Sequence, residues 1–171
     1  MGRHLWILRH AKSSWDDPGL DDHDRPLAPR GQKALRKIRN HLATAEHPPE
    51  LVLCSTARRA VDTFDGVRHA LPSSTLVEIE AELYLADVSS MIVRLRGIDA
   101  EVGSAMIVGH NPGLHDLALN LASTGDPEQL RRLRAKFPTG AVATIRFEGD
   151  WRSLGSEPGR LEDYFTPRPP R

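Results

Sequence analysis

Short runs of apolar residues recur along the chain and alternate with longer amphipathic segments. The runs lie at residues 5–8, 51–54, 75–79, 105–108 and 142–147. An unbroken apolar run of this length is typical of a strand that is covered on both faces of a parallel sheet. The last run alternates more clearly between apolar and polar residues, which favours an antiparallel or edge strand.

The segments between these runs carry apolar residues at helical spacing. They predict helices over residues 30–45, 57–71, 88–96, 112–122 and 128–136. Strands that alternate with helices in this order indicate an α/β fold, here a three-layer α/β/α sandwich with a mostly parallel central sheet. The units are too few for an eight-stranded barrel.

A length of 171 residues fits one domain, and the chain has no internal repeat. We expect this domain to span residues 1–150. The composition then shifts to glycine, proline and charged residues. Residues 151–171 are therefore expected to form a tail that packs on, or extends from, the same domain.

Composition narrows the classes of function. Lysine and arginine together number 23, as do aspartate and glutamate, which argues against a general nucleic-acid or membrane-surface binder. The first residues are too quickly polar for a signal peptide, and no apolar run reaches the length of a membrane span, so we expect a cytoplasmic protein. Cys54 is the single cysteine, and the histidine spacings do not suggest a metal pair, so no metal or cofactor is expected.

Basic and imidazole side chains follow three of the predicted strands. Arg9 and His10 follow the first strand, Arg59 comes shortly after the second, and His110 and Asn111 follow the fourth. Ligands of an open α/β sheet bind at the carboxyl ends of its strands. Arginines and helix N-termini gathered there select an anion with several oxygens, such as phosphate, and a neutral histidine beside them is a competent nucleophile.

Less specific interpretations also apply to several of these residues. Arg58 is expected to be a solvated arginine at a helix start, Asn111 to cap the helix that begins near Pro112, and Lys12 and Ser13 to shape a turn. A cysteine-phosphatase interpretation of Cys54 fails, because Arg59 lies one residue too early for the spacing that such enzymes need.

Four sequence blocks, LWILRHAKSSW, DRPLAPRG, CSTARRAVDT and MIVGHNPG, resemble the histidine phosphatase superfamily, the RHG or phosphoglycerate-mutase-like group. Within that superfamily the resemblance is strongest to the short SixA-type phosphohistidine phosphatases. It implies a phosphoglycerate-mutase-like fold, with Arg9 and Arg59 as phosphate-binding arginines, His10 as the nucleophile and His110 as the second histidine. Ala11 stands where the RHG motif has glycine, and alanine is small enough for the same turn.

The resemblance also implies a mechanism. His10 would attack the phosphorus and water would then hydrolyse the phosphohistidine, while Arg9, Arg59 and His110 hold the oxygens without a metal. Many relatives use a carboxylic acid to protonate the leaving group. Glu82 is the positional candidate for this acid, and three other carboxylic acids are rivals for the role: Glu80, Asp16 and Asp17. Arg25 is expected near the pocket, and Asn111 among the substrate-binding residues.

The resemblance thus implies a phosphohistidine phosphatase. Its partner would be a phosphorylated protein, such as a phosphohistidine carrier or a phosphotransfer domain, or a small phosphate ester. The connections between elements are too short for a substantial lid, so an open site that favours a protein substrate is expected. Two alternatives stay open: a small-molecule phosphomonoesterase or mutase of the same superfamily, and a non-catalytic phosphoprotein-binding module.

Overall fold

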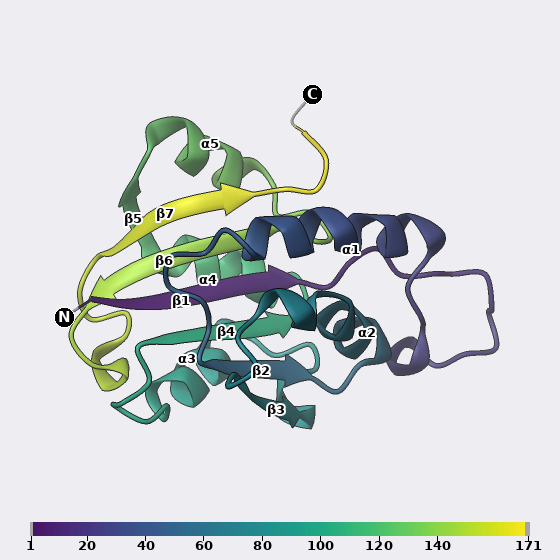
Figure 1. The fold of residues 1–171 in the computed structure, drawn as a ribbon, viewed down its shortest axis with the longest axis horizontal. Helices are drawn as coiled ribbons and strands as arrows, with labels where there is room; N and C mark the ends of the chain where they lie inside the picture. Colours follow the sequence, from purple (N-terminus) through teal and green to yellow (C-terminus); the bar gives the residue numbers. More distant parts are fainter. Residues whose placement is uncertain (1, 170–171) are drawn as a thin grey trace.

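A seven-stranded sheet forms the centre of the computed structural model, which describes residues 2–169 (Figure 1). The strand order is β3-β2-β4-β1-β6-β7-β5. Among these strands only β6 runs antiparallel to its two neighbours, β1 and β7. The strands are β1 (Gly2–Arg9), β2 (Leu51–Ser55), β3 (Leu76–Glu80), β4 (Ser104–Gly109), β5 (Ala122–Gly125), β6 (Val142–Glu148) and β7 (Gly159–Phe165). The expected α/β fold with a mostly parallel sheet is confirmed.

Helices cover both faces of this sheet (Figure 1). They are α1 (Pro29–Leu42), α2 (Arg58–Val67), α3 (Val88–Arg96), α4 (Gly113–Leu121) and α5 (Pro127–Ala135). The buried side chains of α1 and α2 belong to one apolar cluster, and those of α3, α4 and α5 belong to another. The sheet therefore separates two cores, as in a three-layer sandwich.

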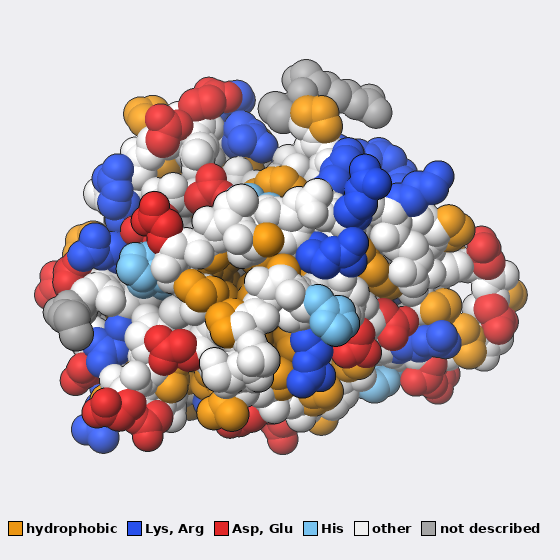
Figure 2. All heavy atoms as spheres, viewed as in Figure 1, with side chains coloured by type: hydrophobic (Ala, Val, Ile, Leu, Met, Phe, Trp, Pro, Cys, Tyr) orange, Lys and Arg blue, Asp and Glu red, His pale blue; other side chains and the backbone are white. Residues whose placement is uncertain are grey.

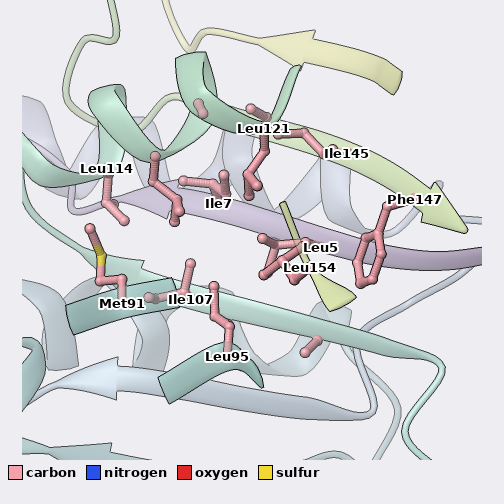
Figure 3. Packing of buried hydrophobic residues seen from close by; sticks show 14 of the residues in the cluster. Leu5, Ile7, Met91, Leu95, Ile107, Leu114, Leu121, Ile145, Phe147 and Leu154 are labelled. Carbon is pink, nitrogen blue, oxygen red and sulfur yellow. The ribbon is translucent and has the colours of Figure 1, made fainter. Parts of the chain in front are cut away.

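The strand β1 shows why an unbroken apolar run predicts a strand that is covered on both faces. Leu5 and Ile7 point into the core with α3 and α4 (Figure 3), whereas Trp6 and Leu8 point into the core with α1 and α2. All four side chains are at most 6% exposed. Burying each contributes about 1.5–3 kcal/mol relative to an exposed side chain, so both faces of β1 hold the layers together.

The C-terminal part of the chain differs from the expected tail. Residues 159–165 form β7, which lies between β6 and β5 inside the sheet. Trp151 is fully buried, and its indole nitrogen donates a hydrogen bond to the carbonyl of Val102. Residues 151–165 are thus part of the sheet and core, and β5, for which we had no prediction, pairs with β7.

The helices within residues 2–169 are too short and too polar to traverse a lipid bilayer.

Candidate functional site

The carboxyl ends of β1, β2 and β4 meet at one edge of the sheet. In the parallel register Arg9 is the partner of Gly109, and Cys54 is the partner of Val108. The residues that follow these strands therefore lie side by side. The rings of His10 and His110 have centroids 5.3 Å apart, so two histidines separated by a hundred positions share one site.

His10 is held with a defined tautomer. Its Nδ1 lies 2.7 Å from the carbonyl oxygen of Ala11, which can only accept, so Nδ1 carries the proton and Nε2 keeps its lone pair. Burial lowers the pKa of His10 to about 3, and the positive charge of Arg59 and Arg9 acts in the same direction. The imidazole is neutral at pH 7, with Nε2 as its basic nitrogen.

His110 is oriented by the end of β2. Its Nε2 lies 2.8 Å from the hydroxyl of Ser55, and that hydroxyl already accepts from the backbone N–H of Ala57. When the Ser55 hydroxyl donates to Nε2, the proton of His110 resides on Nδ1. This Nδ1 is buried and has no hydrogen-bond partner among the described residues. Burial and the charge of Arg59 lower the pKa of His110 to about 4.

Arg9 and Asn111 are tied together through one backbone carbonyl. Arg9 Nη1 and Asn111 Nδ2 both donate to the carbonyl of Phe137, at 3.0 and 2.8 Å. The expected cap is wrong: Pro112 occupies the N-cap position of α4, and the amide of Asn111 is used to bind Phe137. Arg9 Nε and Asn111 Oδ1 are buried without a partner in residues 2–169.

Arg59 lies in the first turn of α2, is 4% exposed and is held by Asp22. Its Nη2 donates to the Asp22 carboxylate at 2.9 Å, and its Nη1 donates to the Asp22 carbonyl at 2.6 Å. Asp22 begins a short 3₁₀ turn, Asp22–Asp24, in the connection between β1 and α1. We did not predict Asp22 as a site residue, because nothing in its local sequence indicates that this connection returns to α2.

An aromatic group borders the two histidines. The Tyr84 ring packs edge-on against His110, with centroids 5.4 Å apart, and its hydroxyl hydrogen-bonds to the Asp22 carboxylate. His23 packs edge-on against Tyr84, and its Nε2 lies 2.8 Å from the hydroxyl of Thr56. The bonds from Tyr84 and then from Arg25 and Arg59 hold the pKa of Asp22 far below its ordinary value.

Thr63 gives the CSTARRAVDT block its structural meaning. Its hydroxyl accepts from the backbone N–H of Ala11 at 2.9 Å and donates to the carbonyl of Arg59 at 2.6 Å. The side chain is fully buried. It therefore fixes the residue after His10 against the helix turn that carries Arg59, which explains the spacing of Arg59 and Thr63.

Two glycines allow close backbone approaches beside His10. A Cβ on Gly31 would lie 2.1 Å from the carbonyl oxygen of Lys12, so only glycine lets α1 pack on this loop. Gly140 has φ +78°, and its N–H points at the carbonyls of Arg9 and His10. The backbone around the nucleophile is thus held from both sides.

Arg25 is buried, and its guanidinium is used to hold the connection after β1. It donates to the carbonyl of Ser14, the hydroxyl of Ser13 and the carboxylate of Asp22. Its guanidinium also stacks on the ring of Trp15, 3.3 Å from the centroid. Arg25 reaches Arg59 through Asp22, so the structure places it at the border of the site.

The carboxylates considered as acids differ in their surroundings. Glu80 is paired with Arg94, whose Nε donates to both of its oxygens, at 2.8 and 3.0 Å. Glu82, in the 3₁₀ turn Ala81–Leu83 two residues before Tyr84, is exposed, as are Asp16 and Asp17. Its assignment as an acid stays a prediction.

Cys54 takes no part in this site. Its thiol is fully buried in the core with α1 and α2, and burial raises the pKa of this thiol to about 12. Within residues 2–169 no three side chains of the metal-binding types are grouped so that they could hold an ion.

Comparison with known proteins identifies close relatives. The model of the histidine phosphatase superfamily (branch 1) matches residues 5–91. An uncharacterised protein of Mycobacterium leprae is 36% identical over 165 residues, which cover 94% of this chain and all of that protein.

Two solved structures share nearly the whole fold. One, from Nakamurella multipartitia and provisionally described as the phosphohistidine phosphatase SixA, has a TM-score of 0.81 at 26% identity and covers 98% of this chain and 97% of its own. The other is the protein histidine phosphatase SixA complexed with tungstate, with a TM-score of 0.75 at 26% identity, covering 96% of this chain and 97% of its own. Similarity to SixA-type structures, expected from the four sequence blocks, is confirmed.

Proposed function

The chain belongs to the histidine phosphatase superfamily, and we propose that within this superfamily it hydrolyses phosphohistidine on a protein, as a SixA-like phosphatase, through a covalent adduct on His10. The solved SixA structures support this proposal through a likeness that covers almost all of this chain. One of them holds tungstate, a tetrahedral oxyanion of the same shape as phosphate.

The observation that carries the proposal is that the neutral nucleophile His10 lies in one site with buried hydrogen-bond donors that have no partner among the described residues. His10 presents the lone pair of Nε2 within a ring that lies 5.3 Å, centroid to centroid, from His110. The buried Nδ1 of His110 and Nε of Arg9 lack partners in residues 2–169. Buried donors of this kind are costly unless a ligand accepts from them, and a phosphoryl group supplies several acceptor oxygens.

The reaction consists of two displacements at phosphorus. In the first, the lone pair of His10 Nε2 forms a P–N bond as the P–N bond of the substrate breaks, and the departing imidazole nitrogen takes up a proton. In the second, water attacks the phosphorus, the bond to Nε2 breaks, and inorganic phosphate leaves with the oxygen of that water. Arg9, Arg59 and His110 offset the charge on the phosphoryl oxygens in both steps.

A phosphohistidine substrate makes a modest demand on acid catalysis, because its leaving nitrogen can be protonated from solvent. The pairing of Glu80 with Arg94 leaves Glu82 as the carboxylate to test as an acid. A phosphate ester, whose leaving alkoxide is poor, would depend on such an acid far more strongly. We propose a phosphorylated carrier or phosphotransfer domain in the cytoplasm as the partner.

The test is a rapid acid or alkali quench with a phosphohistidine carrier labelled on phosphorus. The wild type is expected to show label on the protein during turnover, in an acid-labile, alkali-stable form typical of phosphohistidine. His10→Ala should trap none and hydrolyse none. Normal hydrolysis by His10→Ala would overturn the mechanism, and a rapid turnover of sugar phosphates with no turnover of phosphohistidine would favour a small-molecule phosphomonoesterase.

A further inference from the structure

A basic pocket lies directly beside the proposed phosphate site. It is a cavity of about 290 Å³, and Arg9 lines it from one side. The other charged side chains around it come from the loop after β1, the start of α1, the end of α5 and the segment after β7. They are Lys12, Arg30, Lys136 and Arg168. Five cations thus surround one cavity, and one of them is shared with the site of His10.

The same excess of charge continues along α1. Among its 14 residues the helix carries five lysines and arginines and no aspartate or glutamate. Figure 2 shows the lysine and arginine side chains gathered over α1. Because the whole chain has a formal net charge of zero, this concentration is a property of one face of the molecule. We call the cavity, together with the lysines and arginines of α1, the basic face.

The cations of the cavity lack the carboxylate partners that several other basic residues have. Arg58, Arg94 and Arg131, for example, each lie within 4 Å of a carboxylate. Among residues 2–169 no carboxylate forms an ion pair with any of the five cations that line the cavity. Like charges held together without counter-charges repel one another, and an acidic ligand would relieve that repulsion.

We propose that the basic face binds carboxylates on the surface of the phosphorylated protein substrate, next to its phosphohistidine. This inference rests on the proposed function and adds the recognition of the carrier to it. Arg9 belongs to both the cavity and the phosphate site, so a phosphoryl group on His10 and an acidic side chain in the cavity would be neighbours. Such complementarity raises the rate of encounter and fixes the orientation of a partner.

The dimensions favour a protein over a small ester. Arg30 and Lys37 are seven residues apart on α1, which corresponds to about 10 Å along the helix. The charged surface of α1 is therefore longer than a single phosphate group. A nucleic acid fits less well, because none of the described residues that line the cavity is aromatic, and stacking on aromatic rings is the usual complement to such a groove.

The experiment compares two substrates for the double variant Arg30→Glu with Lys136→Glu. Both side chains are exposed, and the hydrogen bonds of His10 and His110 are made to other residues. With a phosphohistidine carrier domain whose phosphosite is bordered by acidic residues, kcat/KM is expected to fall at least about tenfold, mainly through KM. With free phosphohistidine, kcat/KM should stay within about twofold. Arg134→Glu, an exposed arginine on α5 outside the cavity, serves as the matched control and should leave both substrates unchanged.

Two results would overturn the inference: equal losses with the two substrates, or no loss with the carrier. Binding of a fluorescent hexaglutamate peptide gives a readout that does not depend on turnover. The wild type and Arg134→Glu should bind it and the double variant should not. If the wild type binds the peptide but does not hydrolyse phosphohistidine, the proposed function fails while the acidic-ligand site stands. Equal peptide binding by all three proteins, or tighter binding of a single-stranded oligonucleotide than of the peptide, refutes the site.

Discussion

Asp22 and Arg59 meet through two hydrogen bonds, one from each terminal nitrogen of the guanidinium to the carboxylate and the carbonyl of the same aspartate. Arg59 is therefore fixed in plane and direction before any phosphoryl group arrives. Catalysis of phosphoryl transfer depends mainly on such positioning. The residue that orients Arg59 lies in the connection after β1, 37 positions earlier in the chain.

Asp22→Asn should weaken this positioning. The asparagine variant keeps the backbone carbonyl that accepts from Arg59, but it loses the negative charge of the side chain, to which Arg59, Arg25 and Tyr84 all bind. The kcat/KM for a phosphohistidine carrier is therefore expected to fall about tenfold. Asp21→Asn, an exposed neighbour with no side-chain cap contact, is the control and should leave it unchanged. Equal kinetics for the two variants would show that Asp22 does not orient Arg59.

The histidines of the site are expected to stay neutral in mildly acidic solution. Burial holds the pKa of His10 at about 3 and that of His110 at about 4. The ring-nitrogen chemical shifts of both, measured by NMR on the free protein, should therefore not change between pH 8 and 6. Signals are assigned by their loss in His10→Gln and His110→Gln. A titration midpoint near 6.5 for either ring would contradict this arrangement.

The low pKa of His10 also predicts an acid-sensitive fold. An unfolded histidine binds a proton near pH 6.5, whereas the folded one does so only near pH 3, so the free energy of unfolding falls as pH drops between these values. From pH 7 to pH 5 this single group should cost about 2 kcal/mol. Urea unfolding at the two pH values should show a smaller loss for His10→Gln by that amount. An unchanged loss would mean that His10 is not buried in its neutral form.

Gly31→Ala should destabilise the protein at the site. The added Cβ would lie 2.1 Å from the carbonyl oxygen of Lys12, and forcing the backbones apart is expected to cost about 1–3 kcal/mol. Gly97→Ala, where the nearest backbone atom lies 3.4 Å away, is the control. The urea midpoints of the two variants are compared. Gly31→Ala should also lose activity, because a displaced Lys12 backbone would shift His10, which lies two residues earlier in the same connection.

Leu161→Ala tests whether the C-terminal strand is part of the core. Leu161 is 2% exposed, and its truncation should lower the free energy of unfolding by about 2–5 kcal/mol. Arg160→Ala, exposed on the same strand, should change it by less than about 0.5 kcal/mol. Similar urea midpoints for both variants would mean that β7 adds little to stability.

The parts of the fold that sequence patterns predicted are those whose signal is local. The strands β1, β2 and β4 are buried on every residue that our apolar runs covered, because helices lie on both faces. In β7 the sequence GRLEDYF alternates buried and exposed positions, yet three charged residues and flanking glycine and proline concealed it. The place of β7 in the sheet depends on its pairing with β6 and β5, and a local sequence pattern does not predict which strands pair.

The site followed the same rule. The order of elements was enough to bring His10 and His110 together, because parallel strands end at one edge of a sheet. The contacts of Asp22 and Tyr84 depend instead on how two connections fold back, and neither residue carries a signal of that in its neighbours. Asn111 was misread because a polar residue before a proline at a helix start usually caps, whereas here Phe137 offers a buried carbonyl.

The position of β7 also determines when the sheet can be completed during synthesis of the chain. Strand β5 is made forty residues before the end of β7, yet within the described chain it pairs with no other strand. During translation, β5 therefore has no strand to pair with until β7 has been synthesised and has left the ribosome. A chain that lacks residues 159–165 would therefore leave the edges of both β5 and β6 without their β7 partner.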